Sequence, residues 1–238
     1  MMRWLRVAAL SALAALPARA LDVQPVSVSV PAGPAHAELW LDNPAATPWF
    51  GQARLYRWEQ QGDQERLLAD EALAVSPARL RLGPGQRQRL RVVRLGPAPA
   101  TAEQGYRLVI SPAPGPDMDR TRFSLPVFLV PDAPAAPSSR LRVELAGSTS
   151  APLLRLYNDG DGHAHLADLV FVDAQGRRQT LIDGLAGYVL PRSARGWPLP
   201  ARPGGYAGGR FRARLDHAAE ADLPATTGNI AVRAPSGL

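Results

Sequence analysis

Two histidines spaced two residues apart are the candidate metal ligands of this sequence. His163 and His165 lie in the stretch DGDGHAHLAD with Asp159 and Asp161 beside them, and alternate residues of a strand project from one face. A twelve-residue calcium loop beginning at Asp159 would need a carboxylate at Val170, where none exists. We interpret the stretch as a polar turn that leads into a strand, and we predict no metal site and no cofactor.

Groupings of catalytic residues are also missing from the sequence. The chain has no cysteine, and its four histidines show no grouping with a nucleophile or with convergent carboxylates; they are His36, His163, His165 and His217. It contains no GxSxG elbow, no HExxH pair and no phosphate-binding glycine loop. The glycine-rich segment 202–210 is typical of a hairpin turn. We predict that the protein is not an enzyme, and an envelope hydrolase is the least supported alternative.

The charged residues argue against nucleic acid as a partner. All basic residues are arginine, since no lysine occurs, and the formal net charge is +6. Three of the arginines lie within residues 1–20, so the remainder of the chain has only a mild positive surplus. No cluster interleaves arginine with aromatic residues in the manner of nucleic-acid interfaces.

The first 20 residues have the pattern of a secretory signal peptide. Arg3 and Arg6 precede an apolar run over residues 7–16, and residues 18–20 form the small-x-small sequence of a cleavage site. We predict that residues 1–20 direct export and that the mature chain begins at Leu21. No later segment approaches the roughly 18 apolar residues of a membrane span, so no stable membrane insertion is expected.

The remaining sequence is typical of an all-β protein. Short alternating or apolar segments are bounded by Pro, Gly, Asn and Asp, and no long segment has a helical period. We predict two immunoglobulin-like β-sandwich domains, 21–131 and 139–238, joined by a proline-rich linker at 132–138 that leaves a cleft between them. Strands of the first domain are expected at 21–30, 36–43, 49–60, 79–82, 87–95, 105–111 and 122–130. Strands of the second are expected at 140–147, 153–159, 165–174, 179–185, 187–191, 210–216 and 229–234.

The last expected strand of the first domain has a proline inside its apolar run. Phe123, Leu125 and Val127 alternate with Ser124 and Pro126, and Pro126 has no N–H to donate to a neighbouring strand. We therefore predict an edge strand. The plainer alternative is an ordinary sandwich edge, where proline discourages pairing with other chains.

Several motifs along the chain resemble, in order, the first domain of periplasmic pilus-assembly chaperones of the PapD-like family, especially its archaic, spore-coat-like branch. The most specific are Asn43-Pro44, Arg57-Trp58, Ser76-Pro77, Pro84-Gly85-Gln86, Gln88, Arg91, Glu103, Tyr106-Arg107 and residues 124–128. The second domain is similar to that branch in LRLYNDGDGHAHLADL and in GYVLP followed by Arg195 and Trp197. The resemblance implies two sandwiches arranged in an L and a location in the periplasm.

The resemblance also implies a function. Chaperones of this family lend the last strand of their first domain, here around 117–130, to an incomplete pilin subunit by donor-strand complementation, and deliver the subunit to an outer-membrane usher. Because residues 117–122 are polar, we expect either that the subunit-binding side chains are confined to Thr121, Phe123, Leu125 and Val127 or that the subunit's groove is unusually polar. The alternative is a secreted two-domain adhesive or structural protein that has lost strand lending. Free copies could also cap one another's edges as a dimer.

The resemblance further implies a pair of basic residues that anchor the subunit's C-terminal carboxylate. The corresponding positions are Ser27 and a site at or near Pro126, neither of which is basic. Because the chain has no lysine, any anchor has to be an arginine at a different position. Arg89 and Arg91 share one strand face, Arg107 is expected on the neighbouring strand, and Arg122 enters the lending strand. The candidate anchors are Arg89, Arg91, Arg107 and Arg122, and the alternative is that they are solvated strand residues.

Overall fold

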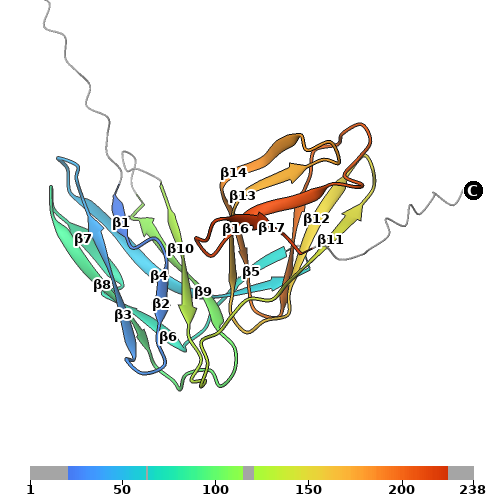
Figure 1. Cartoon of the computed structure of the whole chain (residues 1–238). Coiled ribbons are helices and arrows are strands. Elements are labelled where there is room, and N and C mark those ends of the chain that lie inside the picture. The colour runs from blue at the N-terminus through green and yellow to red at the C-terminus, as the bar shows by residue number, and fades with distance from the viewer. Residues whose placement is uncertain (1–20, 63, 115–120, 225–238) are drawn as a thin grey trace, which may run out of the picture.

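The structure is a computed structural model that describes residues 21–62, 64–114 and 121–224. These residues form strands β1 to β17 and no helix, so the all-β prediction is confirmed. Strands β1–β10 make one sandwich and β11–β17 a second (Figure 1). No helix long and apolar enough to cross a bilayer occurs in the described ranges.

The first domain consists of two sheets. One has the order β1-β3-β8-β6, with bounds Asp22–Gln24, His36–Asp42, Arg87–Arg94 and Leu73–Ser76. The other has the order β2-β10-β9-β4-β5, with bounds Val28–Val30, Phe123–Leu129, Gln104–Pro112, Trp49–Gln61 and Gln64–Leu68. Strand β7 (Arg79–Leu82) also pairs with β4.

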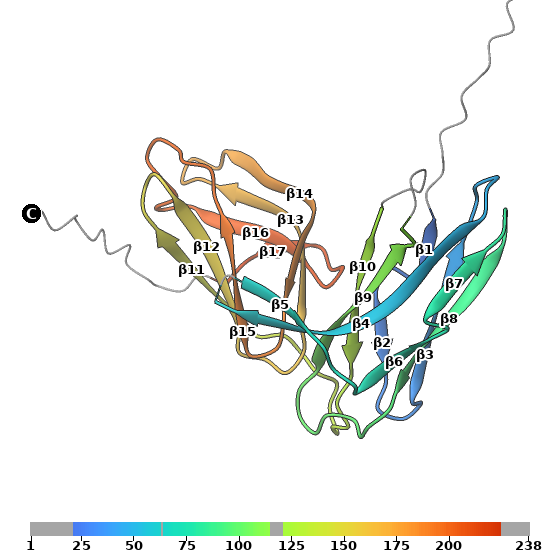
Figure 2. The same cartoon turned by 180° about the vertical axis from the view of Figure 1, so that it is seen from behind.

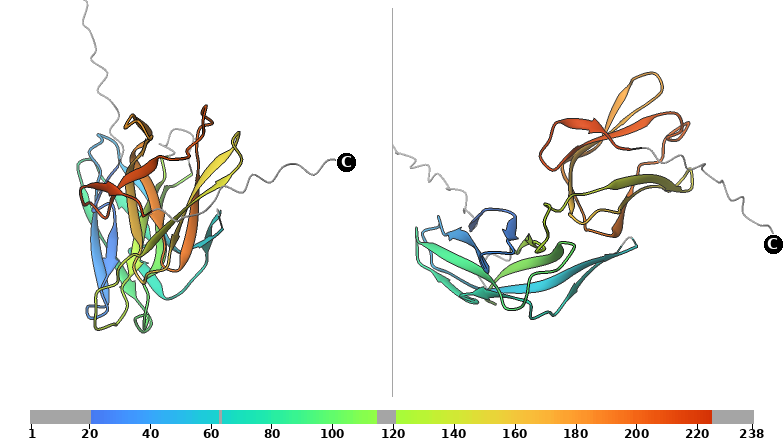
Figure 3. Two further views of the ribbon diagram at one scale, coloured as in Figure 1. Left: turned by 45° about the vertical axis from the view of Figure 1, so that its right-hand side comes forward. Right: turned by 60° about the horizontal axis from the view of Figure 1, so that its bottom comes forward.

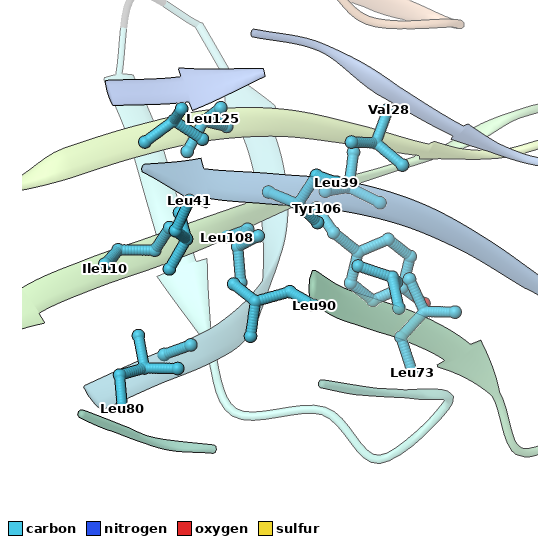
Figure 4. Packing of buried hydrophobic residues seen from close by; sticks show 14 of the residues in the cluster. Val28, Leu39, Leu41, Leu73, Leu80, Leu90, Tyr106, Leu108, Ile110 and Leu125 are labelled. Carbon is cyan, nitrogen blue, oxygen red and sulfur yellow. The ribbon is translucent and has the colours of Figure 1, made fainter. Parts of the chain in front are cut away.

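The core of the first domain lies between these sheets because apolar residues alternate with polar ones along the strands. Leu39 and Leu41 of β3 are fully buried, as are Leu90 of β8 and Leu108 of β9. Figure 4 shows these side chains converging with Leu125 of β10 in one cluster. Each such side chain contributes about 1.5–3 kcal/mol when it is fully buried, so β10 is held by the core as well as by its backbone.

The second domain also consists of two sheets. The first has the order β11-β12-β15, with bounds Leu141–Gly147, Pro152–Asn158 and Ser193–Pro198. The second has the order β14-β13-β16-β17, with bounds Arg178–Val189, Ala164–Val172, Arg210–Leu215 and Glu220–Asp222. Phe171, Tyr206 and Phe211 pack ring against ring in its core, next to the buried Trp197.

Several strand predictions were wrong in their limits. The single strand expected at 21–30 is divided into β1 and β2, which belong to different sheets on either side of Pro25. The strands expected at 179–185 and 187–191 are one strand, β14, and its pairing with β13 is interrupted by register shifts. Strands β5, β6, β15 and β17 were not predicted, and the strand expected at 229–234 lies outside the described residues.

The two domains are joined by more than their linker. Figure 2 shows them set at an angle, and Figure 3 shows the β4–β5 hairpin reaching from the first domain toward the second. The buried side chain of Gln60 donates from Nε2 to the Tyr188 carbonyl (2.9 Å) and accepts at Oε1 from the Leu190 N–H (2.8 Å). Glu65 forms an ion pair with Arg195 at 3.0 Å. The hairpin therefore fixes the second domain against the first.

Candidate functional site: an open strand flank beside a cleft

Strand β10 is paired along the whole of one flank and along only part of the other. It pairs antiparallel with β9 from Phe123 to Leu129. On the opposite flank, β2 pairs with it in parallel, but only over Val127–Leu129. The backbone of β10 from Phe123 to Pro126 therefore has no strand neighbour on that side among the described residues. The predicted edge is real for the first half of the strand and absent for the second half.

Pro126 lies where the parallel ladder stops. The Val130 N–H donates to the Val30 carbonyl at 2.9 Å, and backbone groups two residues apart on a strand point the same way. The nitrogen of Pro126 therefore faces the β2 flank, so its missing N–H removes no bond to β9. The missing N–H does leave the β2 flank without the backbone donor that would face Val26, a residue that is 74% exposed. The backbone N–H and C=O of Ser124 point toward the same open flank.

The side chains predicted to bind a subunit lie mostly against this domain's own core. Leu125 and Val127 are 4% and 0% exposed and belong to the first-domain cluster, and Phe123 packs against it. Figure 4 shows Leu125 directed into that cluster. Thr121 is exposed and precedes β10. The described part of the strand thus presents its backbone flank outward, while its bulky side chains face inward.

A cleft between the domains lies alongside this open flank. Its cavity has a volume of about 930 Å³ and extends from Ser124 and Pro126 to the second domain. Its walls come from the β1–β2 connection, from β9 and β10, and from β13, β14 and the β16–β17 turn. The residues used below are Ser27, Arg107, His165, Tyr188 and His217.

Arg107 is the candidate anchor that lines the cleft. It lies on β9 opposite Pro126, and its Cζ atom is 3.7 Å from the ring centroid of Trp58 and 5.9 Å from that of Tyr188. Burial lowers the pKa of Arg107, with the Glu65 charge acting in the opposite direction; an arginine nevertheless stays charged. No ion pair joins its guanidinium to a carboxylate in the described ranges. A partly desolvated cation therefore faces the cavity.

The other candidate anchors lie elsewhere. Arg89 and Arg91 are on β8, in the opposite sheet from β9, and both pair with Glu38 at 3.5 and 2.9 Å. The expectation that Arg107 lies on the strand next to them is therefore wrong. Arg122 is exposed immediately before β10 and does not line the cleft. Only Arg107, of the four, lines the cleft.

Ser27 lines the cleft, at the position where the resemblance implies a basic anchor, but it is not basic and lies near Tyr188. Burial raises the pKa of Tyr188, and the nearby Ser27 side chain acts in the opposite direction. The β1–β2 connection thus lies beside β14 of the second domain. No sequence pattern indicated this proximity, because the two residues are far apart in the chain.

His163 belongs to the domain interface. Its ring stacks on that of Phe128 with centroids 3.5 Å apart, and its Nδ1 lies 2.7 Å from Glu103 Oε2. The backbone N–H of His163 also donates to that carboxylate at 2.8 Å. Glu103 is one of the motif residues, but its partner could not be inferred from sequence. Within the described ranges, no group of three or more metal-ligating side chains is found.

Comparisons with known proteins agree with this geometry. Residues 20–133 match the family described as "Pili and flagellar-assembly chaperone, PapD N-terminal domain". Among curated proteins, none matches the chain in sequence.

Solved structures of pilus chaperones share the fold of both domains. The structure is similar to the chaperone in the CsuC–CsuE chaperone–tip adhesion subunit pre-assembly complex of Acinetobacter baumannii, with 20% identity, 87% of this chain and 98% of that chain covered, and a TM-score of 0.69. The E. coli chaperone DraB is 18% identical, with 87% of this chain and 97% of that chain covered and a TM-score of 0.60. The Salmonella enterica SafA pilin in complex with the SafB chaperone gives 19% identity, with 85% of this chain and 93% of that chain covered and a TM-score of 0.59. The first domain of this chain belongs to the PapD-like family of pili and flagellar-assembly chaperones, and its two domains together have the fold of those chaperones.

Proposed function

We propose that this protein is a periplasmic chaperone that binds incomplete pilus subunits by donor-strand complementation through β10. The observation that carries the proposal is the backbone flank at Phe123–Pro126, which has no described strand neighbour and opens into the cleft. An incomplete sandwich exposes unpaired backbone groups, and a strand added at this flank would pair them. The chaperone–subunit complexes among the similar structures support the same function.

Arg107 fixes the direction in which a subunit strand would lie. Arg107 pairs with Pro126 in the β9–β10 register, at the end of the open flank, and its guanidinium can hold a carboxylate through two hydrogen bonds. A subunit that ends beside Arg107 would run along β10 with its C-terminus toward Pro126, parallel to β10. We keep Thr121, Phe123, Leu125 and Val127 as predicted contacts of the bound state, in which the latter two contribute through the shared core.

The remaining assignments follow from the same proposal. We assign the first domain to residues 21–131, the linker to 132–138 and the second domain to 139–238. The end of β10 at Leu129 and the start of β11 at Leu141 support this division. Export through residues 1–20, delivery to an outer-membrane usher and a self-capping dimer of free copies are parts of the proposal that rest on the family alone.

Co-expression tests the proposal. The full chain would be produced in a bacterial periplasm together with the small pilin-like subunits encoded beside its gene, and purified by a tag on the chaperone. We expect a complex with one copy of each protein, measured by size-exclusion chromatography with light scattering. Recovery of free chaperone with aggregated subunits would instead favour a two-domain adhesive or structural protein.

A further inference from the structure

A second feature of the cleft is a pair of histidines that the proposed chaperone function does not use. We propose that His165 and His217 form a binding point for a carboxylate of the bound pilus subunit, across the cleft from Arg107. This inference rests on the proposed function and adds to it a second recognition group. It also predicts that subunit binding strengthens as the pH falls.

The two imidazole rings lie against each other on the second-domain wall of the cleft. Their centroids are 4.7 Å apart with an interplanar angle of 25°. The His165 ring also lies 5.0 Å from the ring of Tyr188, which Arg107 approaches from the first domain at 5.9 Å. Both histidines and Arg107 line the same cavity. The three side chains therefore face one cavity from both domains, with Tyr188 between Arg107 and His165.

His217 is held in place by an unusual turn. Asp216 and His217 have φ values of 49° and 66°, and the Ala218 N–H donates to the Leu215 carbonyl at 2.8 Å. This is the geometry of a type I′ turn, which strongly prefers Asn-Gly at its centre. Non-glycine residues seldom adopt positive φ, and those that do are concentrated at binding sites. The turn holds the His217 imidazole against the His165 ring. A glycine at this position would have no side chain to stack there.

Both imidazoles have hydrogen-bonding capacity that the described residues leave unused. Nδ1 of His165 is buried, and neither ring nitrogen has a hydrogen-bond partner within the described ranges. No ion pair joins either ring to a carboxylate in the described ranges, in contrast to His163 with Glu103. The neighbouring Asp216 carboxylate accepts from the His165 backbone N–H at 2.8 Å. A ligand with hydrogen-bond acceptors and negative charge fits these groups.

Among the charged groups around the pair, Arg107 is the cation that favours an anion in the cleft. The titratable and charged groups that face it are His163, Tyr188, Arg214, Asp216, Arg107, Asp22 and Glu103. Of the three carboxylates, Glu103 is paired with His163, Asp216 accepts the His165 backbone N–H and by its charge raises the pKa of His165 against the larger effect of burial, and Asp22 lines the cleft from the first domain. Arg214 is paired with Asp168 at 2.6 Å. Arg107 forms no ion pair with a carboxylate of the described residues. A carboxylate is the anion that a polypeptide subunit provides, at its C-terminus or on an acidic side chain.

The pH dependence follows from linkage. Burial, and then the charge of His217, lower the pKa of His165 in the free protein. A bound carboxylate stabilises the protonated ring, so the pKa is higher in the complex than in the free protein. Affinity is therefore constant above the pKa of the complex and increases as the pH falls from that value toward the pKa of the free protein. The subunit carboxylate stays ionised over this range, since its ordinary pKa is near 4.

The experiment measures the dissociation constant of the complex between the full chaperone and its co-expressed subunit at pH values of about 7.5 and 5.5. We expect binding to be about ten-fold tighter at the lower pH, which corresponds to about one pKa unit of coupling. The double variant His165→Gln with His217→Gln should lose most of this increase. His217→Gln alone tests the exposed ring, where a folding defect is not expected. His36→Gln is the matched control, since His36 lies on β3 and does not line the cleft.

Each outcome has a distinct meaning. An equal increase in the wild type and the double variant, or no increase in the wild type, would overturn this inference and leave the chaperone function intact. Failure of any complex to form at either pH would instead overturn the proposed function. A subunit extended by one neutral residue separates the two sources of the carboxylate. Loss of the pH effect there identifies the terminus, and its retention identifies an acidic side chain.

Discussion

Arg107 stacks its guanidinium on the ring of Trp58 and forms no ion pair within the described part of the chain. Arg107→Ala removes the proposed anchor, and we expect subunit affinity to fall about 10- to 100-fold, as for the loss of a hydrogen bond to a charged group. Isothermal titration calorimetry with the co-purified subunit measures this. Arg89→Ala is the control, because Arg89 is exposed and pairs with Glu38 outside the cleft. Equal effects of the two substitutions would show that the anchor lies elsewhere.

His165 predicts that the free protein loses stability as the pH falls, whereas the affinity for a subunit increases. Its pKa is lowered by burial, so the unfolded chain binds the proton more readily, and the free energy of unfolding decreases as the pH falls below about 6.5. Because the ring is partly exposed, we expect a contribution below about 1 kcal/mol. Urea unfolding of the wild type and His165→Gln between about pH 7.5 and 5.5 measures it. A steeper decrease in the variant would contradict the sign.

At the scale of the element, β10 has one flank used by β9 and one that is half open. Ser124→Pro removes the N–H that points to the open flank, and the β9 ladder keeps its bonds because that N–H faces away from it. We expect complex formation to be lost while the midpoint of thermal unfolding changes little, as measured by calorimetry and co-purification. Ser124→Val is the matched control, since it keeps the N–H and suits a strand. A complex that survives Ser124→Pro would mean that another edge binds the subunit.

The same strand also contributes to the core. Leu125→Ala would leave a cavity among fully buried side chains of the first domain, and we expect a loss of about 2–5 kcal/mol in the free energy of unfolding. Chemical denaturation measures this loss. Thr121→Ala, at an exposed position, should change stability by less than about 0.5 kcal/mol. If the two substitutions cost the same, β10 is not anchored by its inward side chains as described.

At the scale of the whole molecule, the angle between the domains depends on buried polar contacts. Gln60→Ala leaves the Tyr188 carbonyl and the Leu190 N–H without their partner, at a cost of about 1–3 kcal/mol for each buried group. We expect a lower unfolding midpoint and a wider range of interdomain angles, measured by calorimetry and small-angle X-ray scattering. Gln61→Ala, at the exposed neighbouring position, should change neither.

The sequence predicted elements better than contacts between them. Alternation of apolar and polar residues identified β3, β4 and β8 nearly to their ends, because each buries one face. It missed β5, whose five residues are all exposed and therefore carry no alternating pattern. Pro126 indicated an edge correctly for half of β10, but the short parallel partner β2 had no signal of its own.

The candidate site was predictable only in part. Arg107 could be named because the chain has no lysine and the usual basic positions are Ser27 and Pro126. Its selection over Arg89, Arg91 and Arg122 needed the sheet assignment, which places β8 and β9 on different layers. The meeting of His165 with His217 could not be predicted, because it depends on a turn 50 residues further along the chain that adopts positive φ at both central residues.

The hairpin that crosses from one domain to the other has a further consequence. Trp58 is on its first strand and is buried in one apolar cluster with Phe128 from the first domain and with Tyr188 and Leu190 from the second. Cutting the chain at the linker would therefore expose this cluster on both fragments, although each fragment contains a complete sandwich. The two halves should melt together in a single calorimetric transition, and either half made alone should be prone to aggregate.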